Sequence, residues 1–335
     1  MKLRVSLLVA AIILLTSSLY GQTRYLADST LLEDWEKNSP PLKPYFVDIK
    51  NSNADDNGPG SKQRPFRSIN MAAQILQPGE KVIIAEGIYR ESVHPLRGGE
   101  GADKMITYEA APGAEVIIKG SVVVKDGWES SHGWRNISNR DDSSENALRI
   151  WQLKLDGSLF NGYNPFGMDN VLHNRYWMNY GDINMTPHLR KRGMVFVDGR
   201  PLEPVQLYSE LIRPGSNSLN AYREDRWSPI FEEISGFAGK FWIEHNGQTI
   251  HIRLADDSSP EEHKIEITTK EQVFAPKERH LGYIRLKGLT VEHAANGFPV
   301  PQRGMVSTHR GHHWIIEQCT LRWANSVALD IGKEV

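Results

Sequence analysis

The sequence is poor in the features that define several common classes of protein. It contains one cysteine among 335 residues, Cys319, so no disulfide bond can form within the chain. Its 39 basic and 41 acidic side chains leave a net charge of -2, which gives no electrostatic basis for binding nucleic acid or an anionic membrane. Its one long run of mostly apolar residues, 5–15, is too short to span a bilayer. The fold must therefore depend on an apolar core, for which 39% hydrophobic residues suffice.

The N-terminal residues have the pattern of an export signal. Lys2 and Arg4 precede the apolar run, and small or polar residues separate it from Gln22. This pattern predicts a secretory signal peptide over residues 1–21, and a secreted or periplasmic protein without a membrane anchor once the signal is cleaved. An uncleaved anchor is the alternative. No cysteine follows the run, which argues against a lipid-modified N-terminus, and residues 22–43 are expected to form an irregular leader.

Two segments near the end of the sequence carry the same pattern. One begins at Tyr283 and the other at His313. When they are aligned, apolar or identical residues match in the pairs Ile284/Trp314, Leu286/Ile316, Leu289/Cys319, Thr290/Thr320, Val291/Leu321 and Ala294/Ala324. Short strands that recur at a fixed spacing cannot bury their apolar side alone and must stack on one another. The repeat therefore predicts a parallel β-solenoid.

A second alignment extends the repeat, because Gly304–Thr308 matches Val327–Ile331 as the next face of the coil. The coils are thus expected to occupy residues 281–335. The sequence ends within a coil, and nothing after Asp330 resembles the capping element that covers the open end of a solenoid. We therefore expect the sequence to be the front part of a longer protein.

Residues 44–124 are expected to form an N-terminal cap and the first coils. Ser68 is a suitable N-cap for a short helix that ends at Pro78-Gly79, and such a helix would plug the start of the solenoid. The apolar face of this helix would consist of Ile69, Ala72, Ala73 and Leu76. Strands are predicted at Val82–Ala85, Ile106–Tyr108 and Val116–Ile118.

The stretch from about Pro44 to Gly120 resembles the N-terminal signature of the pectate-lyase-like superfamily. The features in common are an extended strand, an Asp/Asn/Gly loop, a Pro-Phe-x-Ser-Ile helix start, a Pro-Gly-Glu turn and a Val-x-x-x-x-Gly-x-Tyr strand, in that order. The resemblance implies an all-β fold, a right-handed parallel β-helix with a short N-terminal capping helix.

Between residues 125 and 280 the repeat character disappears. Asn246-Gly247 lies between two alternating segments and is a strong β-hairpin signal, which predicts an inserted antiparallel β-sandwich. The order of capping helix, early coil, inserted sandwich and resumed coils resembles secreted glycoside hydrolases of families 120 and 141. The resemblance implies a carbohydrate-active enzyme, although no catalytic motif of these families is matched.

Equivalent residues in successive coils lie about 4.8 Å apart, so the alignment predicts which charges meet. Glu292 aligns with Arg322, and Glu317 aligns with Lys287. For these acids a solvated ladder of opposite charges is favoured over catalysis. Asp330 aligns with Ser307 and has no basic neighbour. It is expected to face outward into a substrate groove as a catalytic carboxylate, the alternative being an ordinary strand aspartate near a turn.

Other candidates suit the binding of sugar rings. His293 and Trp323 share a column, and His309 and Arg310 lie in the loop that enters the next coil. These four are predicted to contact substrate, because aromatic faces stack on sugars and polar groups bond hydroxyls. Aromatic side chains that only stabilise the coil are the equal alternative.

No metal or cofactor is expected. The three histidines of the motif His309-x-x-His312-His313 lack an acidic partner and helical spacing, which disfavours zinc. The loop Asp55–Gly58 has the composition of a calcium-binding turn but not its full ligand spacing. Cys319 is interpreted as a small core residue rather than a reactive thiol.

The sequence thus favours a secreted glycoside hydrolase that cleaves a plant or algal polysaccharide, or its oligosaccharides, with two carboxylic acids. A polysaccharide lyase, in which Arg310 would neutralise a uronate, is the second hypothesis. A non-catalytic carbohydrate-binding β-helix is the third, because fold alone does not choose among them. Nucleic acid is not an expected partner, and the sequence carries no signal for an oligomeric state.

Overall fold

The computed structural model describes residues 44–132, 134, 149–170, 190–212, 237–297 and 303–332. The predicted signal peptide and leader, residues 1–43, lie outside the described residues. All described residues belong to one compact unit, residues 40–335. Within this described part, no helix is long and apolar enough to cross a membrane.

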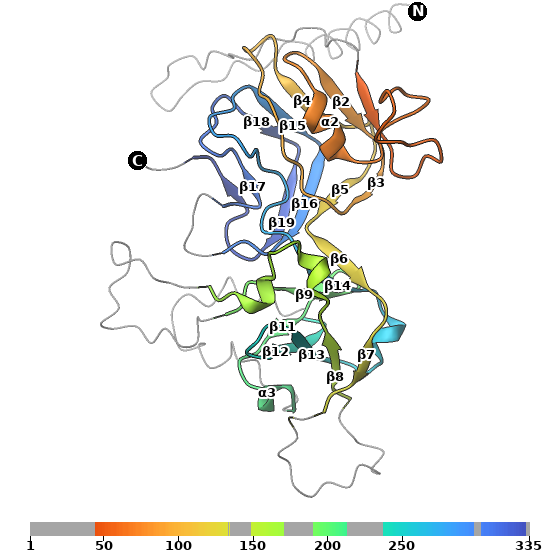
Figure 1. The fold of residues 1–335 in the computed structure, drawn as a ribbon, viewed down its shortest axis with the longest axis vertical. Helices are drawn as coiled ribbons and strands as arrows, with labels where there is room; N and C mark the ends of the chain where they lie inside the picture. The colour runs from red at the N-terminus through yellow and green to blue at the C-terminus, as the bar shows by residue number, and fades with distance from the viewer. Residues whose placement is uncertain are drawn as a thin grey trace, which may run out of the picture. The chain divides into compact units, whose positions relative to one another are not determined.

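The first region of the fold is built from parallel strands (Figure 1). One sheet has the order β1-β2-β4-β15-β18 and another has the order β19-β16-β5-β3. The strands of the first sheet are β1 (Tyr45–Val47), β2 (Lys81–Ile84), β4 (Ile106–Ala110), β15 (Ile284–Lys287) and β18 (Ile315–Glu317). Those of the second are β3 (Gly87–Tyr89), β5 (Val116–Lys119), β16 (Leu289–Ala294) and β19 (Thr320–Ala324). A short third pair consists of β17 (Val306–Ser307) and β20 (Leu329–Asp330).

These strands form because alternate residues are apolar and point to one shared core. Val82, Tyr108, Leu286 and Ile316 occupy one register across four neighbouring strands. The first three of these side chains are at most 1% exposed. In this column, β4 precedes the non-repeating segment of the sequence and its neighbour β15 follows it. The same parallel sheet is therefore built from both parts of the chain.

The predicted stacking of the two repeats is confirmed. Thr290 pairs with Thr320 and Val291 with Leu321. The backbone repeats as well, because left-handed φ angles recur 30 residues apart in the pairs His280/Arg310, Tyr283/His313, Gly288/Gln318 and His293/Trp323. Equal corners at equal spacing keep successive strands in register.

The predicted helix is also confirmed, as α2 (Ile69–Ile75). The Ser68 side chain accepts from the N–H of Met71 at 3.2 Å, as an N-cap does. Ile69, Ala72 and Ala73 are buried against the core of the parallel sheets. The loop before it is held by its own acids, since Asp55 pairs with Arg64 and the Asp56 carboxylate accepts from Ser68.

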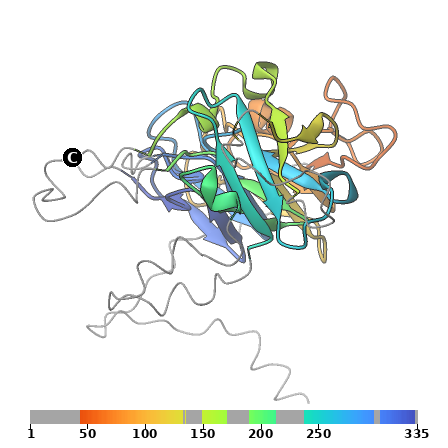
Figure 2. The ribbon, with the colours of Figure 1, turned by 90° about the horizontal axis from the view of Figure 1, so that it is seen from below.

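The second region consists of two mainly antiparallel sheets that share an apolar core, and Figure 2 shows its strands from below. One sheet contains β10 (Arg200–Pro201), β9 (Val195–Val197), β14 (Ile265–Thr268) and β6 (Ser121–Val124). The other contains β11 (Glu203–Pro204), β12 (Gly239–Ile243), β13 (Thr249–Leu254), β8 (Trp151–Lys154) and β7 (Trp128–Ser130). The short helices are α3 (Ser209–Ile212), η1 (Gly157–Phe160), η2 (Pro165–Gly167) and η5 (Pro260–Glu262).

The Asn246-Gly247 hairpin is present between β12 and β13. Gly247 has a φ of 67°, and a Cβ atom there would lie 2.3 Å from the Cα atom of Gly167. Glycine is therefore required both by the backbone conformation and by the close approach of the neighbouring loop. The strands of this region run from Ser121 to Thr268, whereas the predicted domain spans residues 125–280.

The two ends of this region meet. Ser121 pairs with Thr268 across β6 and β14, and the Thr269 N–H donates to Gly120 O at 2.8 Å. The Gly120 N–H in turn donates to Glu292 O at 3.0 Å. The junction between the two regions is therefore closed by backbone hydrogen bonds.

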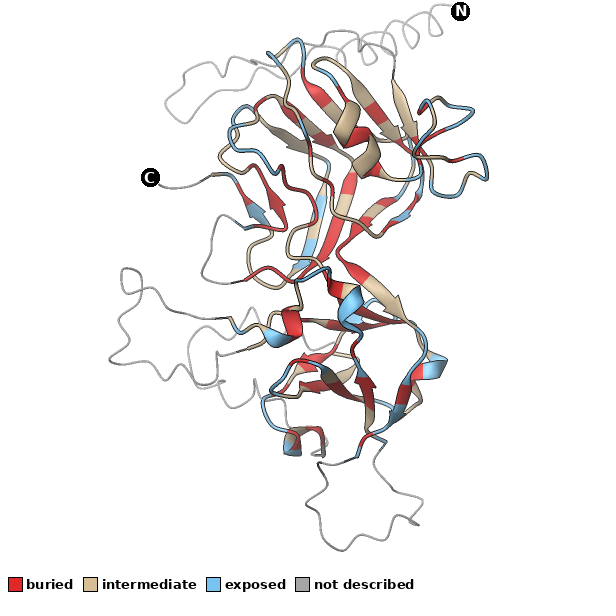
Figure 3. Cartoon of the chain, in the orientation of Figure 1, coloured by how far each residue is buried: buried red, intermediate tan, exposed pale blue. Residues whose placement is uncertain are grey.

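Figure 3 shows that buried residues lie along the strands of both regions.

Candidate functional site

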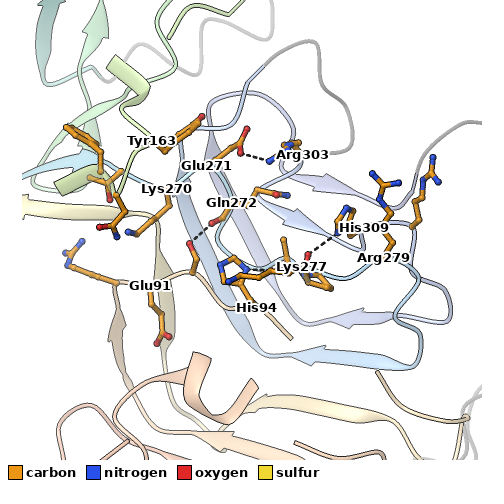
Figure 4. A pocket seen from close by; sticks show the side chains of 18 residues that line it. Glu91, His94, Tyr163, Lys270, Glu271, Gln272, Lys277, Arg279, Arg303 and His309 are labelled. Atoms are coloured by element: carbon orange, nitrogen blue, oxygen red, sulfur yellow. Dashed lines mark hydrogen bonds and ion pairs between the residues drawn. The ribbon is translucent and has the colours of Figure 1, made fainter. Parts of the chain in front are cut away.

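A cavity of about 880 Å³ is lined by segments from both regions (Figure 4). The loop after β3 contributes residues 90–94, and the loop after β14 contributes residues between 269 and 279. Phe160, Asn161 and Tyr163 come from η1 and the turn after it, while His309 and Arg310 follow β17. A cavity of this size is within the range of small-molecule sites.

One wall of the cavity is fixed by a short parallel ladder. Val93 bridges to Phe274, Phe274 bridges to Val306, and Val306 pairs with Leu329. The first three of these side chains are fully buried, so the ladder is part of the core. Because the apolar residues anchor each loop, the polar residues beside them are held in place.

Hydrogen bonds between the loops add to this order. The Ser92 hydroxyl donates to Gln272 O at 2.8 Å, and the Gln272 side chain donates to Gly304 O at 3.0 Å. His94 Nδ1 lies 2.8 Å from Ala275 O, and His309 Nδ1 lies 3.1 Å from Pro276 O. Because these hydrogen bonds are all within the protein, the cavity wall is ordered without a ligand.

The cavity carries more positive than negative charge. Six arginine and lysine residues line it, against the two acids Glu91 and Glu271. Glu271 pairs with Arg303 at 2.8 Å. Arg90 is directed to the buried Glu266 at 2.5 Å. The lining residues thus favour an anionic rather than a cationic ligand.

Glu91 is the acid with a strongly changed pKa in this cavity. Its carboxylate accepts from the N–H groups of Ile69 and Asn70, at 2.9 and 2.8 Å, at the start of α2. Burial raises the pKa of Glu91 to about 6, although these two hydrogen bonds favour the charged form. Both oxygens are engaged by the helix, so the geometry supports a structural role for this acid.

Two of the predicted substrate contacts, His309 and Arg310, line this cavity. Both have left-handed backbones, with φ angles of 50° and 64°. The angle at Arg310 belongs to the coil corner that recurs at His280, so the coil itself fixes the backbone at this wall. The structure therefore brings these two candidates together at one wall of the cavity.

The other pair, His293 and Trp323, does not line the cavity. His293 is 1% exposed and stacks on Phe196, with ring centroids 3.7 Å apart and an interplanar angle of 8°. Trp323 meets the edge of the same ring at 6.0 Å. In this structure His293 is closed off by Phe196 of β9, which the repeat alone did not indicate.

His293 belongs to a buried cluster of charges, here called the Lys119 cluster and made up of Arg90, Lys119, Ser121, Glu266, Glu292, His293 and Arg322. Lys119 Nζ lies 2.7 Å from Glu292 Oε1 and 3.3 Å from Glu266 Oε2. Arg322 forms a further ion pair with Glu292, through its Nε atom and Glu292 Oε2. Burial raises the pKa values of both glutamates, but the facing cations outweigh it and keep them below normal.

This cluster corrects the predicted charge ladder in one respect. Glu292 does lie beside Arg322, but it is 2% exposed and not solvated. Glu317 is in register with Lys287, yet its carboxylate accepts from Arg285 Nε at 2.8 Å, while Lys287 pairs with Glu109 at 3.1 Å. Register alone therefore did not decide which side chains paired, because Glu317 and Lys287 each have a different partner.

We expect His293 to make stability fall in acid. Burial, with Lys119 nearby, lowers its pKa to about 4, whereas in the unfolded chain its pKa is about 6.5. Between these values the unfolded state binds the extra proton, so the free energy of unfolding decreases as pH falls from 6.5 to 4. The difference corresponds to about 3 kcal/mol.

Urea unfolding of the wild type and of His293→Gln, across this pH range, measures the effect. Between pH 6.5 and pH 4, the free energy of unfolding of the variant should decrease by about 3 kcal/mol less than that of the wild type. Replacement of the exposed His245 by Gln is the matched control and should leave the pH dependence unchanged. Parallel pH curves for the wild type and His293→Gln would contradict the assignment.

Asp330 is in register with Ser307, as the alignment predicted. Its expected outward, open position differs from the structure, because it is 5% exposed and accepts from the Gly304 N–H at 2.8 Å. Leu329 and Ile331, the apolar residues on either side of Asp330, are 36% and 77% exposed. Among the described residues no strand stacks beyond β20, so these apolar side chains have no further layer to cover them.

The carboxyl of Asp330 keeps one feature of a catalytic acid. Burial raises its pKa, against hydrogen bonds from Ser307 and Gly304 that favour the charged form. Its Oδ1 atom is buried and has no hydrogen-bond partner within the described chain. Asp330 does not line the cavity, although His309, which does, contributes to its electrostatic environment.

The remaining candidates are placed as follows. Cys319 packs against the core of the parallel sheets, and burial raises the pKa of its thiol. His312 and His313 lie with their Nδ1 atoms 2.8 Å apart. Over the described ranges, no group of three or more metal-binding side chains is found.

Sequence reasoning did not single out Glu91, Lys270, Lys277 or Arg279 as cavity residues. They lie in loops whose sequences repeat nothing, and their convergence depends on the ladder from Val93 to Val306. The closely spaced cations between Lys270 and Arg279 are the one signal that sequence alone offered.

No protein-family model matches the sequence, and no curated protein is similar to it at a significant level. Among solved structures, the fold is similar to that of XylC in a complex with xylose, with a TM-score of 0.63 and 24% identity. That match covers 83% of this chain and 40% of the XylC chain, so the chain spans less than half the length of this relative. A second structure, described as a glycoside hydrolase, matches 76% of this chain and 51% of its own chain, with a TM-score of 0.40 and 12% identity.

Proposed function

We propose that the full gene product is a secreted carbohydrate-active enzyme that hydrolyses glycosidic bonds of a polysaccharide or its oligosaccharides. The fold proposed for it is a right-handed parallel β-helix with an inserted β-sandwich. The observation that carries the proposal is the likeness to XylC over 83% of the chain, because that structure holds a sugar. The parallel sheets and the loop-lined cavity beside them support it.

Hydrolysis of a glycosidic bond requires two carboxyl groups. One protonates the leaving oxygen, and the other acts as a nucleophile or activates water. Asp330 is proposed as the acid, because burial raises the pKa of its carboxyl. The second carboxylate is proposed to lie beyond residue 335, in the remainder of a longer protein.

A polysaccharide lyase is the second candidate, and the surplus of cations in the cavity favours it. A lyase removes a proton next to a uronate carboxyl group, and Arg310 would neutralise that carboxylate. The product of elimination contains a new carbon–carbon double bond that absorbs ultraviolet light, whereas hydrolysis forms no such bond.

The test is to incubate the complete protein with plant and algal polysaccharides and to measure reducing ends and ultraviolet absorbance together. Hydrolysis predicts new reducing ends without a gain in absorbance. A parallel gain in both would overturn hydrolysis in favour of elimination. Glycan binding without either product would instead support a non-catalytic binding protein.

A further inference from the structure

Four cations of the cavity have no side-chain partner within the described chain. They are Lys270, Lys277, Arg279 and Arg310. The other two basic residues, Arg90 and Arg303, are neutralised by Glu266 and Glu271. Like charges gathered in one cavity repel one another and do not stabilise the fold, and an anionic ligand would remove this repulsion.

The loop that carries three of these cations is fixed by backbone hydrogen bonds. The Phe274 N–H donates to Met305 O and the Ala275 N–H donates to Val93 O, each at 3.0 Å, within the loop that carries Lys270, Lys277 and Arg279. Arg310, at a corner of the coil, adds a fourth cation from the loop after β17. The backbone of the site is thus fixed in advance, whereas the exposed side chains of Lys277 and Arg279 become ordered when the ligand binds.

The cations are also spread along the cavity. Lys270 and Arg279 lie at opposite ends of it, with Lys277 and His309 between them (Figure 4). A single small anion cannot contact both ends, whereas an extended molecule with repeated negative groups can. Tyr163, near the Lys270 end, supplies aromatic surface of the kind that packs on sugar rings.

We propose that this cavity binds an acidic oligosaccharide whose carboxylate or sulfate groups meet Lys270, Lys277, Arg279 and Arg310. The inference rests on the proposed function in so far as the ligand is a saccharide. It adds the substrate class, an anionic glycan, and the residues that bind it, in a cavity that Asp330 does not line but whose His309 acts on the Asp330 carboxyl. A nucleic acid is also an extended anion, but the net charge of -2 provides no broad basic surface for one.

Calorimetric titration of the complete protein tests the proposal with four probes. These are an oligogalacturonate, a sulfated galactan oligosaccharide, a neutral xylo-oligosaccharide of equal length, and single-stranded oligothymidylate. We expect one or both acidic glycans to bind, more weakly as sodium chloride is added, and the neutral glycan and the oligothymidylate to bind at least tenfold more weakly. Selective binding of the first or second probe identifies carboxylate or sulfate as the recognised group.

Variants locate the site. Lys270→Gln and Arg279→Gln should each weaken binding of the acidic glycan about tenfold, because each loses one charge-assisted contact. The matched controls Lys125→Gln and Arg149→Gln remove exposed cations outside the cavity and should leave affinity unchanged. Equal affinity for the neutral glycan or for oligothymidylate, or no effect of the cavity variants, overturns the proposal.

The binding-site proposal and the hydrolase proposal can be contradicted independently of each other. Tight binding of an acidic glycan without any bond cleavage leaves the binding site standing and removes the hydrolase assignment. Cleavage of neutral glycans by a protein that does not bind acidic ones does the reverse.

Discussion

Replacing Lys119 by methionine is expected to lower the free energy of unfolding by about 3–5 kcal/mol, among the largest effects of any single substitution in this chain. Lys119 Nζ stands between the carboxylates of Glu292 and Glu266, at 2.7 and 3.3 Å. Methionine fills a similar volume but carries no charge. The two facing carboxylate oxygens would then be buried, at 2% and 0% residue exposure, without the cation that separates them.

Urea unfolding at neutral pH measures the loss. Lys50→Met is the matched control, because Lys50 pairs with Glu86 at 2.6 Å while both side chains are more than 60% exposed. Exposed pairs contribute less than about 1 kcal/mol. Adding Glu266→Gln to Lys119→Met should restore part of the stability, since one of the repelling charges is removed. A loss for Lys119→Met no larger than that of Lys50→Met would show that the cluster does not need its central cation.

Replacing Asp330 by asparagine is expected to reduce hydrolysis by the complete protein at least about 100-fold, because an amide cannot donate the proton that the leaving oxygen needs. The substitution keeps the shape of the side chain and its ability to accept from the Gly304 N–H. Folding should therefore be retained. Initial rates on the best glycan, with the thermal unfolding midpoint of each variant, measure the effect.

Ser307→Ala is the matched control for Asp330. It removes the hydroxyl that faces Asp330 in the same register, but it leaves the carboxyl in place. We expect its rate to change much less than that of Asp330→Asn. Unchanged turnover in a folded Asp330→Asn protein would remove Asp330 from the catalytic step and leave it as a structural acid.

The sequence was informative wherever neighbouring residues decide the outcome. The pairing of Thr290 with Thr320 and of Ser307 with Asp330 followed from the repeat, because strands in successive layers share one inward pattern. The N-cap at Ser68 followed from local capping chemistry. The Asn246-Gly247 turn did likewise, since its backbone conformation is set by two residues.

The sequence was uninformative where distant segments meet. Phe196 covers His293 although it lies almost 100 residues earlier and outside any repeat. Glu266 enters the Lys119 cluster from β14 in the same way. The burial of Asp330 depends on Gly304, whose N–H reaches its carboxylate across the last pair of strands. Alignment of repeats gives register, but it does not give the side chains that a second region places over it.

The meeting of residues 121 and 268 has a consequence for how the chain folds. The pairing of β5 with β16 joins segments about 170 residues apart, a contact order that slows folding when the intervening chain is loose. Once the antiparallel sheets have formed, Ser121 and Thr268 are neighbours, and the same pairing closes a loop of only about 26 residues. The second region is thus placed to fold first and to act as a clamp that brings the two halves of the parallel sheets together.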